Sequence, residues 1–390
     1  MARWTITRGS RAHSLLRTVT AAAAIAVLVA LPLVFNGVGQ IQDLSQMAAY
    51  AVAILGLCLL TGYCGQISLG HSVFVGIGAY NTVILVAVHG WPFLATIPVS
   101  IALCFVVGLI TGIPALRIRG LYLATVTLAL AAVFPTLIDK YSGLTGGANG
   151  MFAVNDMNAP TPFFVNPYTP SAQPTDRYYV IVVIAALMFL TARNIVRSRI
   201  GRAFVAIKES PASAAASGIA VARYKIFAFA VSAAFAGVAG SLLAIELPTV
   251  ADSSFTLNLS IFLLVALIAG GSSSIAGAVP GALIFVVLQT YIPNWTASLN
   301  LLSGQPAGGQ IAGIISGVLL AAFVFLLQGG VVDGLDRLRR RILRIAEPPP
   351  TGWRDMPFAA DSRPQTDPDS AADASPAALP SEIAQERLGR

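Results

Sequence analysis

The chain has 390 residues, of which 56% are hydrophobic and only 11% are charged. Ordinary soluble domains are about a quarter charged, so this chain has too little charge to cover a soluble surface. The composition points to a membrane protein and argues against a secreted disulfide scaffold, a coiled coil or a fully disordered chain. Three cysteines, all in apolar stretches, are expected to be small buried side chains rather than redox or metal-binding groups.

Ten apolar runs follow one another along the chain. They cover residues 19–35, 44–60, 72–88, 93–113, 121–138, 178–192, 226–245, 259–269, 275–291 and 311–328. A helix needs about 20 residues to cross the hydrocarbon core of a bilayer. The runs therefore predict an all-α, polytopic transmembrane helix bundle of about ten spans (8–10). Because 178–192 and 259–269 are short, we expect them to be broken or re-entrant helices.

The positive charges predict the orientation of these spans. With the N-terminus in the cytoplasm, eighteen of the twenty lysines and arginines of residues 1–344 fall on the inner side, and only Lys140 and Arg177 fall outside. Such a bias is typical of cytoplasmic loops. We therefore expect a multi-pass protein of the inner (plasma) membrane with both termini in the cytoplasm.

Four regions are expected along the chain. Residues 1–18 are predicted to be a cytoplasmic segment and residues 19–330 the transmembrane domain. Residues 331–344 are predicted to form a basic amphipathic helix on the inner leaflet. Residues 345–390, acidic and rich in proline, lack hydrophobic periodicity and are predicted to be disordered.

The sequence lacks several features that other classes of protein need. No apolar run contains Asp, Glu, Lys or Arg, whereas ion-coupled carriers usually keep ionisable groups at membrane depth. No lysine follows a glycine, so a Gly-Lys-Ser/Thr phosphate loop is missing and we expect no ATP hydrolysis and no cofactor on this chain. The three histidines are too scattered to predict a metal site. The basic residues lack the interleaved aromatics of a nucleic-acid surface.

A glycine-rich interruption separates the second and third runs. Two interpretations stay open: a broken helix that lines a solute path, or a short loop followed by a helix-packing face. On the first interpretation, uncharged polar groups of this segment and of the fifth run hold the solute. The candidate path residues are Gly62, Gly65, Gln66, Ser68, Gly70, His71, Thr125 and Thr127.

A short helix is predicted in the cytoplasmic loop 193–225. Ser210 is a good N-cap, Pro211 suits the first helical position, and Gly218 can end the helix in the left-handed conformation. About two turns are not stable alone, so this helix either docks on a partner or packs on its own bundle. The candidate coupling residues are Arg202, Glu209, Ser210, Pro211, Ala214 and Gly218.

Four motifs in order give the chain a resemblance to a known family. They are Gly-x-x-Gly-Gln-x-Ser-Leu-Gly-His at 62–71, Gly-Leu-Thr-Gly-Gly-x-x-Gly at 143–150, Gly-Arg-x-x-x-Ala-Ile-Lys-Glu at 201–209 and a Gly-Ile-x-x-x-Arg-Tyr-Lys segment with a following small-residue stretch at 218–240. In these motifs the chain resembles the permease subunits of branched-chain amino acid ABC importers (LivM type). Two departures are Pro211 and Ala215, where the family often has acidic residues.

The resemblance implies a set of partners and a mechanism. It implies a second, homologous permease subunit, two cytoplasmic ABC ATPases that bind ATP, and an extracytoplasmic solute-binding protein, with residues 201–219 docking on the ATPase. Transport is then expected to proceed by alternating access. Urea, a short amide or another amino acid remains open as the solute, and a passive channel, an ion-coupled carrier or a membrane anchor remains open as the class.

Overall fold

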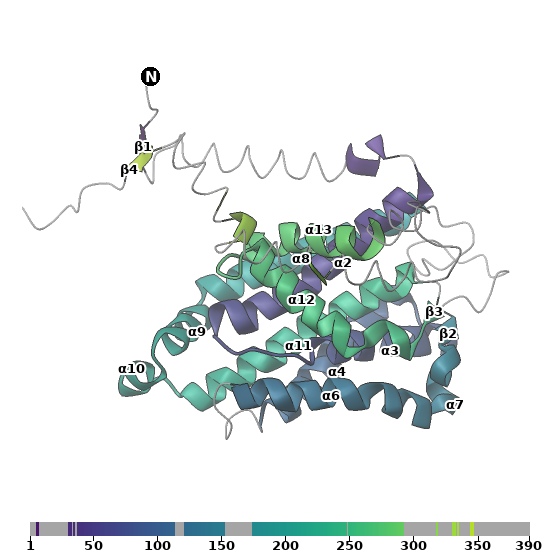
Figure 1. Ribbon diagram of the computed structural model, residues 1–390, viewed down its shortest axis with the longest axis horizontal. Coiled ribbons are helices and arrows are strands. Elements are labelled where there is room, and N and C mark those ends of the chain that lie inside the picture. Colours follow the sequence, from purple (N-terminus) through teal and green to yellow (C-terminus); the bar gives the residue numbers. More distant parts are fainter. Residues whose placement is uncertain are drawn as a thin grey trace, which may run out of the picture. The chain divides into compact units, whose positions relative to one another are not determined.

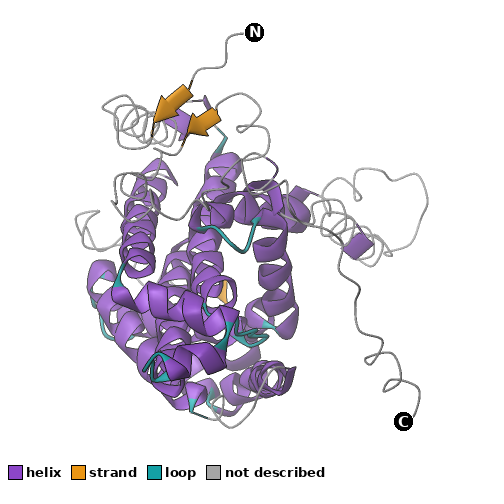
Figure 2. Ribbon diagram, turned by 90° about the vertical axis from the view of Figure 1, so that its left-hand side faces the viewer, coloured by secondary structure: helices purple, strands orange, loops and turns teal. Residues whose placement is uncertain are grey.

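The computed structural model describes residues 5–7, 30–32, 34–35, 37–113, 121–152, 174–247, 249–291, 317–318, 330–332, 334 and 344–346. The chain forms two units, Leu16–Ile342 and the pair of segments Met1–Leu15 and Leu343–Arg390. The first unit is built almost entirely of helices (Figures 1 and 2). Their bounds are α2 Val38–Leu57, η1 Cys58–Tyr63, α3 His71–Ala87, α4 Phe93–Gly112, α6 Leu121–Lys140, α7 Ser142–Thr145, η2 Gly147–Asn149, α8 Pro174–Arg197, α9 Arg199–Glu209, α10 Pro211–Ala216, α11 Val221–Glu246, η3 Asp252–Phe255, α12 Leu257–Gly270, η4 Ile275–Gly277, α13 Ala278–Val286 and η5 Val287–Tyr291.

The helices follow the apolar runs of the sequence. Eight of the ten predicted runs coincide with described helices, namely α2–η1, α3, α4, α6, α8, α11, α12 and α13–η5. Among the described residues, five helices are long and apolar enough to cross a membrane, and two shorter apolar helices accompany them. The runs 19–35 and 311–328 lie almost entirely outside the described residues, so ten spans stay a prediction.

The run 178–192 is part of a longer helix than its hydropathy indicated. Helix α8 extends over 24 residues, because polar residues at both ends continue the helix beyond the apolar stretch. The prediction of a short or broken helix is therefore wrong at this position. Helix α12 has 14 residues and follows the 3₁₀ turn η3. The combined segment Asp252–Gly270 is one of the five long enough to cross a membrane, so its hydropathy run also indicated too short an element.

Helix α11 is the centre of the bundle and packs against α2, α3 and α4. It is buried on all sides from Ala228 to Glu246. Small residues permit this close packing: a Cβ on Gly240 would overlap the carbonyl oxygen of Val75, and one on Gly78 would overlap that of Gly237. Such glycine contacts let helix backbones approach in a membrane, where no hydrophobic force drives helices together.

A chain of polar side chains links three of these helices. Ser241 of α11 donates a hydrogen bond to the Ser100 hydroxyl of α4 at 2.8 Å, and the Asn81 amide of α3 donates to the same oxygen at 2.8 Å. Buried polar groups in an apolar bundle require partners of this kind. The network therefore helps to set the register of α3, α4 and α11.

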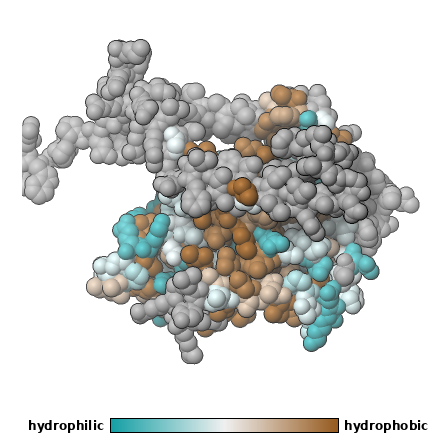
Figure 3. Space-filling view, in the orientation of Figure 1, coloured by the Kyte–Doolittle hydropathy of each residue, from teal (hydrophilic) through white to brown (hydrophobic). Residues whose placement is uncertain are grey.

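The described loops gather at two opposite ends of the bundle. Helices α9 and α10 lie at one end, and α7 lies with strands β2 (Met151–Phe152) and β3 (Thr249–Val250) at the other (Figure 1). The two strands pair antiparallel, with Met151 opposite Val250. Between these ends, one face of the bundle is strongly hydrophobic (Figure 3). Exposed apolar side chains on α4 and α8, such as Ile110 and Leu187, are placed as expected for contact with lipid.

The second unit contains one described element pair. Strand β1 (Thr5–Thr7) pairs in parallel with β4 (Arg344–Ala346). Most of the predicted N-terminal segment, amphipathic helix 331–344 and tail 345–390 lies outside the described residues, and these assignments stay predictions.

Candidate functional site

The predicted interruption between the second and third runs is present. Helix α2 passes into the π-helix η1, residues 64–70 leave the helical conformation, and α3 begins at His71. Gly65 has a φ of 73°, a conformation that favours glycine. The backbone N–H of Gln66 donates to the carbonyl of Leu60 at 3.1 Å, which holds the turn close to the end of η1. We name residues 61–70 the helix break.

The polar side chains in and beside the helix break are buried. Gln66, Ser68 and His71 are only 6%, 0% and 1% exposed. His71 lies 2.9 Å from the carbonyl oxygen of Ala53 through its Nε2. Among the described residues, Gln66 Oε1 and Ser68 Oγ have no hydrogen-bond partner. A buried oxygen without a hydrogen bond raises the free energy of the folded protein. A donor group of a bound solute would satisfy these two atoms, so they are the acceptors that the helix break offers.

Helix α6 covers part of the helix break. The Leu69 N–H donates to Thr127 Oγ1 at 2.9 Å, and a Cβ on Gly70 would overlap the Thr127 carbonyl. Thr125 is exposed, because residues two apart on a helix point about 200° apart. The structure therefore gathers seven of the eight candidate path residues, Gly62, Gly65, Gln66, Ser68, Gly70, His71 and Thr127, and turns the Thr125 side chain away.

The motif at 201–219 forms two consecutive helices, α9 and α10. Ser198 caps α9 by accepting from the Ile200 N–H, and Ser210 caps α10 by accepting from the Ser213 N–H. Pro211 occupies the first turn of α10, and Gly218 adopts a φ of 81° just beyond its end. The predicted start and end of this short helix are confirmed.

The side chains of α10 divide into one buried residue and an exposed surface. Ala214 is 2% exposed and packs on the chain's own core, so the small side chain expected to face a partner instead anchors the helix. Ala212 and Ala216 lie one helical turn apart on the opposite side and are exposed. The other candidate coupling residues are placed as follows: Arg202, Glu209, Pro211 and Gly218 are exposed, and Ser210 is half-buried.

The loop helices are attached directly to the helix break. Lys208 of α9 donates from Nζ to the carbonyl oxygen of Gly62 at 2.7 Å. Its aliphatic stem lies over Gly65, where an added Cβ would be 3.1 Å from Lys208 Cγ. The Gln66 amide donates to the carbonyl oxygen of Lys225, near the start of α11, at 3.2 Å. Lys208 was not among the candidate residues, although two of the chain's three lysines lie in this loop.

The turn between α12 and η4 closes the other side of the helix break. A Cβ on Gly62 would overlap the carbonyl oxygen of Ser272. The Cys58 thiol lies 3.6 Å from the carbonyl oxygens of Ser272 and Ser274. Helices α9 and α11 and the α12–η4 turn thus all contact the helix break, although they are far apart in the sequence.

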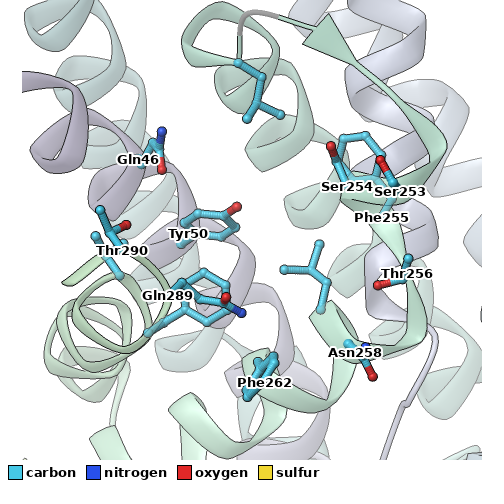
Figure 4. A pocket seen from close by; sticks show the side chains of 14 residues that line it. Gln46, Tyr50, Ser253, Ser254, Phe255, Thr256, Asn258, Phe262, Gln289 and Thr290 are labelled. Carbon is cyan, nitrogen blue, oxygen red and sulfur yellow. The ribbon is translucent and has the colours of Figure 1, made fainter. Parts of the chain in front are cut away.

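A cavity of about 370 Å³ lies elsewhere in the bundle. Its walls come from α2, η3, the first turns of α12 and the α13–η5 helix, and none of the candidate path residues is among the described residues that line it. One side carries Gln46, Tyr50, Gln289 and Thr290, and the facing side carries serine, threonine and asparagine side chains of η3 and α12 (Figure 4). All these side chains are uncharged. Sequence reasoning missed them because they come from four separate segments without a shared motif.

Glu246 is another residue that sequence reasoning missed. It ends α11 one residue beyond the predicted apolar run and is only 7% exposed. Gln42 donates to its backbone carbonyl at 2.9 Å, and its Oε1 has no hydrogen-bond partner among the described residues. No group of three His, Cys, Asp or Glu side chains in the described chain is placed to hold a metal ion.

A bundle of apolar helices with an interrupted helix and two exposed loop helices is typical of an integral membrane transport protein. Residues 40–327 match the family described as "Branched-chain amino acid transport system / permease component". Because this match covers most of the chain, the chain belongs to that family.

Relatives in bacteria and an archaeon agree with this assignment. The chain is 30% identical over 291 residues to the high-affinity branched-chain amino acid transport system permease protein LivM of Escherichia coli K12, covering 70% of this chain and 67% of that protein. It is also 30% identical over 285 residues to LivM of Salmonella typhimurium, covering 68% of this chain and 66% of the relative. A probable branched-chain amino acid transport permease protein, LivH of Methanocaldococcus jannaschii, is 28% identical over 270 residues, covering 67% of this chain and 80% of the relative. No solved structure matches the chain.

Proposed function

We propose that the chain is one permease subunit of an ABC importer that moves branched-chain amino acids across the inner membrane by alternating access. A second permease, two cytoplasmic ATPases and an extracytoplasmic solute-binding protein complete the importer. ATP is bound and hydrolysed by the ATPases. The chain itself binds no cofactor, and its N- and C-termini are cytoplasmic.

The observation that carries this proposal is the contact between α9 and the helix break. An exposed pair of loop helices offers a surface to a cytoplasmic partner, and Lys208 connects that surface to the Gly62 carbonyl inside the bundle. A motion of α9 and α10 would therefore displace the break between α2 and α3. A permease whose motion is driven by a separate ATPase requires such a linkage. A passive channel does not require it.

The grouping of the loops supports the expected orientation. The segments predicted to be cytoplasmic, namely the helix break, α9 and the 272–274 turn, contact one another at one end of the bundle. The segments predicted to be external, β2 and β3, pair at the other end. Each of these pairs of described loops thus lies on one side of the membrane in the predicted topology.

Reconstitution of the importer in proteoliposomes tests the proposal. We expect uptake of leucine that needs internal ATP, both ATPases and the solute-binding protein, and we expect no comparable uptake of urea. Uptake that persists without the ATPases would identify a channel or carrier instead.

Point variants of α10 test the docking surface. Ala216→Trp places a bulky side chain on the exposed surface, so we expect loss of ATPase binding and of uptake, while the matched variant Ala216→Ser keeps both. Full ATPase binding by Ala216→Trp would exclude this surface as the docking site.

A further inference from the structure

We propose that the cavity between α2, η3, α12 and η5 is a transient binding site for an amino-acid zwitterion without net charge, an inference that rests on the proposed function. The cavity of about 370 Å³ falls at the small end of the range of ligand pockets, about 300–1,000 Å³. Uncharged polar groups and aromatic rings face the same space there (Figure 4).

The absence of charged side chains from the described lining decides the class of ligand. A solute with a net charge would meet no countercharge in the described lining, and a charge that loses its hydration without a partner is unfavourable. A zwitterion of an apolar amino acid has no net charge and needs only dipoles for its two ends. The lining therefore favours neutral amino acids over lysine, arginine or glutamate.

The first turn of α12 suits the carboxylate of the ligand. The helix begins at Leu257, and within the described chain no side chain caps its N-terminus. Thr256, at the N-cap, and Asn258, in the first turn, both line the cavity (Figure 4). Free N–H groups and the partial positive charge of a helix start favour an anion, and the hydroxyl and amide side chains add donors.

The opposite wall suits the ammonium group and the apolar side chain. Gln46 of α2 and Gln289 of η5 offer amide oxygens as acceptors for N–H groups (Figure 4). Tyr50 and Phe285 pack with ring centroids 4.3 Å apart, and Phe262 of α12 also lines the cavity. A branched aliphatic side chain against these rings would remove apolar surface from water.

The position of the cavity fits delivery from outside the cell. Its wall includes Leu247 and Ser253, which flank strand β3 in the chain, so it lies toward the end opposite α9 and α10. In the predicted topology that end is extracytoplasmic. A site that holds its ligand through dipoles alone also releases it readily, as a transport step requires.

Thiol labelling tests occupancy of the cavity in the assembled importer. Ser254→Cys places a thiol in the wall, and the three native cysteines are buried. We expect increasing leucine concentrations to slow its reaction with N-ethylmaleimide about tenfold, and lysine to have no effect. Ser142→Cys, exposed on α7 at the same end, is the control and should react equally fast with or without leucine.

A size variant tests whether the cavity is used in transport. Gln289→Trp fills the cavity, whereas Val287→Trp changes an exposed residue of the same helix that does not line it. We expect the first variant to lower ATP-driven leucine uptake about tenfold and the second to leave it unchanged. Melting temperatures of both variants show whether each is folded.

The outcomes separate this inference from the proposed function. If the wild-type importer takes up leucine but leucine does not protect Ser254→Cys, and Gln289→Trp transports normally, the inference is overturned and the function stands. If leucine protects the thiol but the wild-type importer shows no ATP-dependent uptake, the proposed function fails and the binding site stands.

Discussion

Lys208 Nζ donates a hydrogen bond of 2.7 Å to the carbonyl oxygen of Gly62, across 146 residues of sequence. A helix of the loop 193–225 is thereby attached to the place where the α2 segment loses its helical conformation. The contact links the surface offered to a partner with the interior of the bundle. It is the structural basis of the first prediction.

Lys208→Met keeps the aliphatic stem over Gly65 but removes the donor. We expect ATP-driven leucine uptake to fall about tenfold, within the usual range of coupling between sites, while ATP hydrolysis continues. The measurement is uptake per ATP hydrolysed in proteoliposomes. Lys140→Met, which changes an exposed lysine at the end of α6, serves as the control. Equal coupling ratios for the two variants would show that the contact does not transmit motion.

Gly62→Ala should destabilise the protein because a Cβ there meets backbone rather than a movable side chain. The overlapping atom is the carbonyl oxygen of Ser272, so the α12–η4 turn would have to move. We expect a loss of about 2–4 kcal/mol in the free energy of unfolding, as for other severe packing errors. Thermal unfolding in detergent measures the change. Gly39→Ala in α2, where a Cβ meets nothing within 4 Å, should be neutral or slightly stabilising.

Ser260→Ala tests a buried polar pair near the start of α3. Ser260 Oγ accepts from the Ser72 N–H at 2.9 Å and donates to Ser72 Oγ at 2.7 Å. Both serines are fully buried, so the variant leaves polar groups of Ser72 without their partner. We expect destabilisation of about 1–3 kcal/mol, again from thermal unfolding. The comparison is Thr191→Ala, on the exposed side of α8, and a similar cost for both variants would refute the argument.

Gly218→Val tests the end of α10. The φ of 81° at this position strains a β-branched residue, although a Cβ would meet no neighbour within 4 Å. We expect a cost of about 1–2 kcal/mol from the left-handed backbone and weaker binding of the ATPase, measured by co-purification. Gly218→Asn should retain most of the binding, since asparagine tolerates this conformation at helix ends. If both variants bind like the wild type, the left-handed turn does not shape the docking surface.

The sequence predicted the helices and their ends more accurately than the functional groups. Apolar runs mark eight described helices, because burial in lipid or protein demands an apolar stretch of about the right length. The cap at Ser210 and the turn at Gly218 were also predictable, since both depend on neighbouring residues alone. The length of α8 was not predictable from hydropathy, because the residues at both of its ends are polar and lie outside the apolar run.

The candidate site was predictable only in part. The glycine interruption at 62–70 was visible in the sequence, and Thr127, which the sequence grouped with it, does contact it. The contact of Lys208 with Gly62, the inward position of Ala214 and the burial of Glu246 were not visible. Each of these depends on which side a residue presents to a distant segment, and hydropathy along the chain does not report that.

Local properties of the chain thus establish a membrane-embedded helical protein with a glycine interruption and a small capped loop helix, and they predict its orientation from the positive charges. Only helix packing determined which polar groups contact one another. Close glycine contacts of α11 bring α2, α3 and α4 together, and the helix break contacts α9 and the α12–η4 turn. The cavity in particular has no sequence signature. Its walls come from segments some 240 residues apart, from Gln46 to Gln289, that only helix packing makes neighbours.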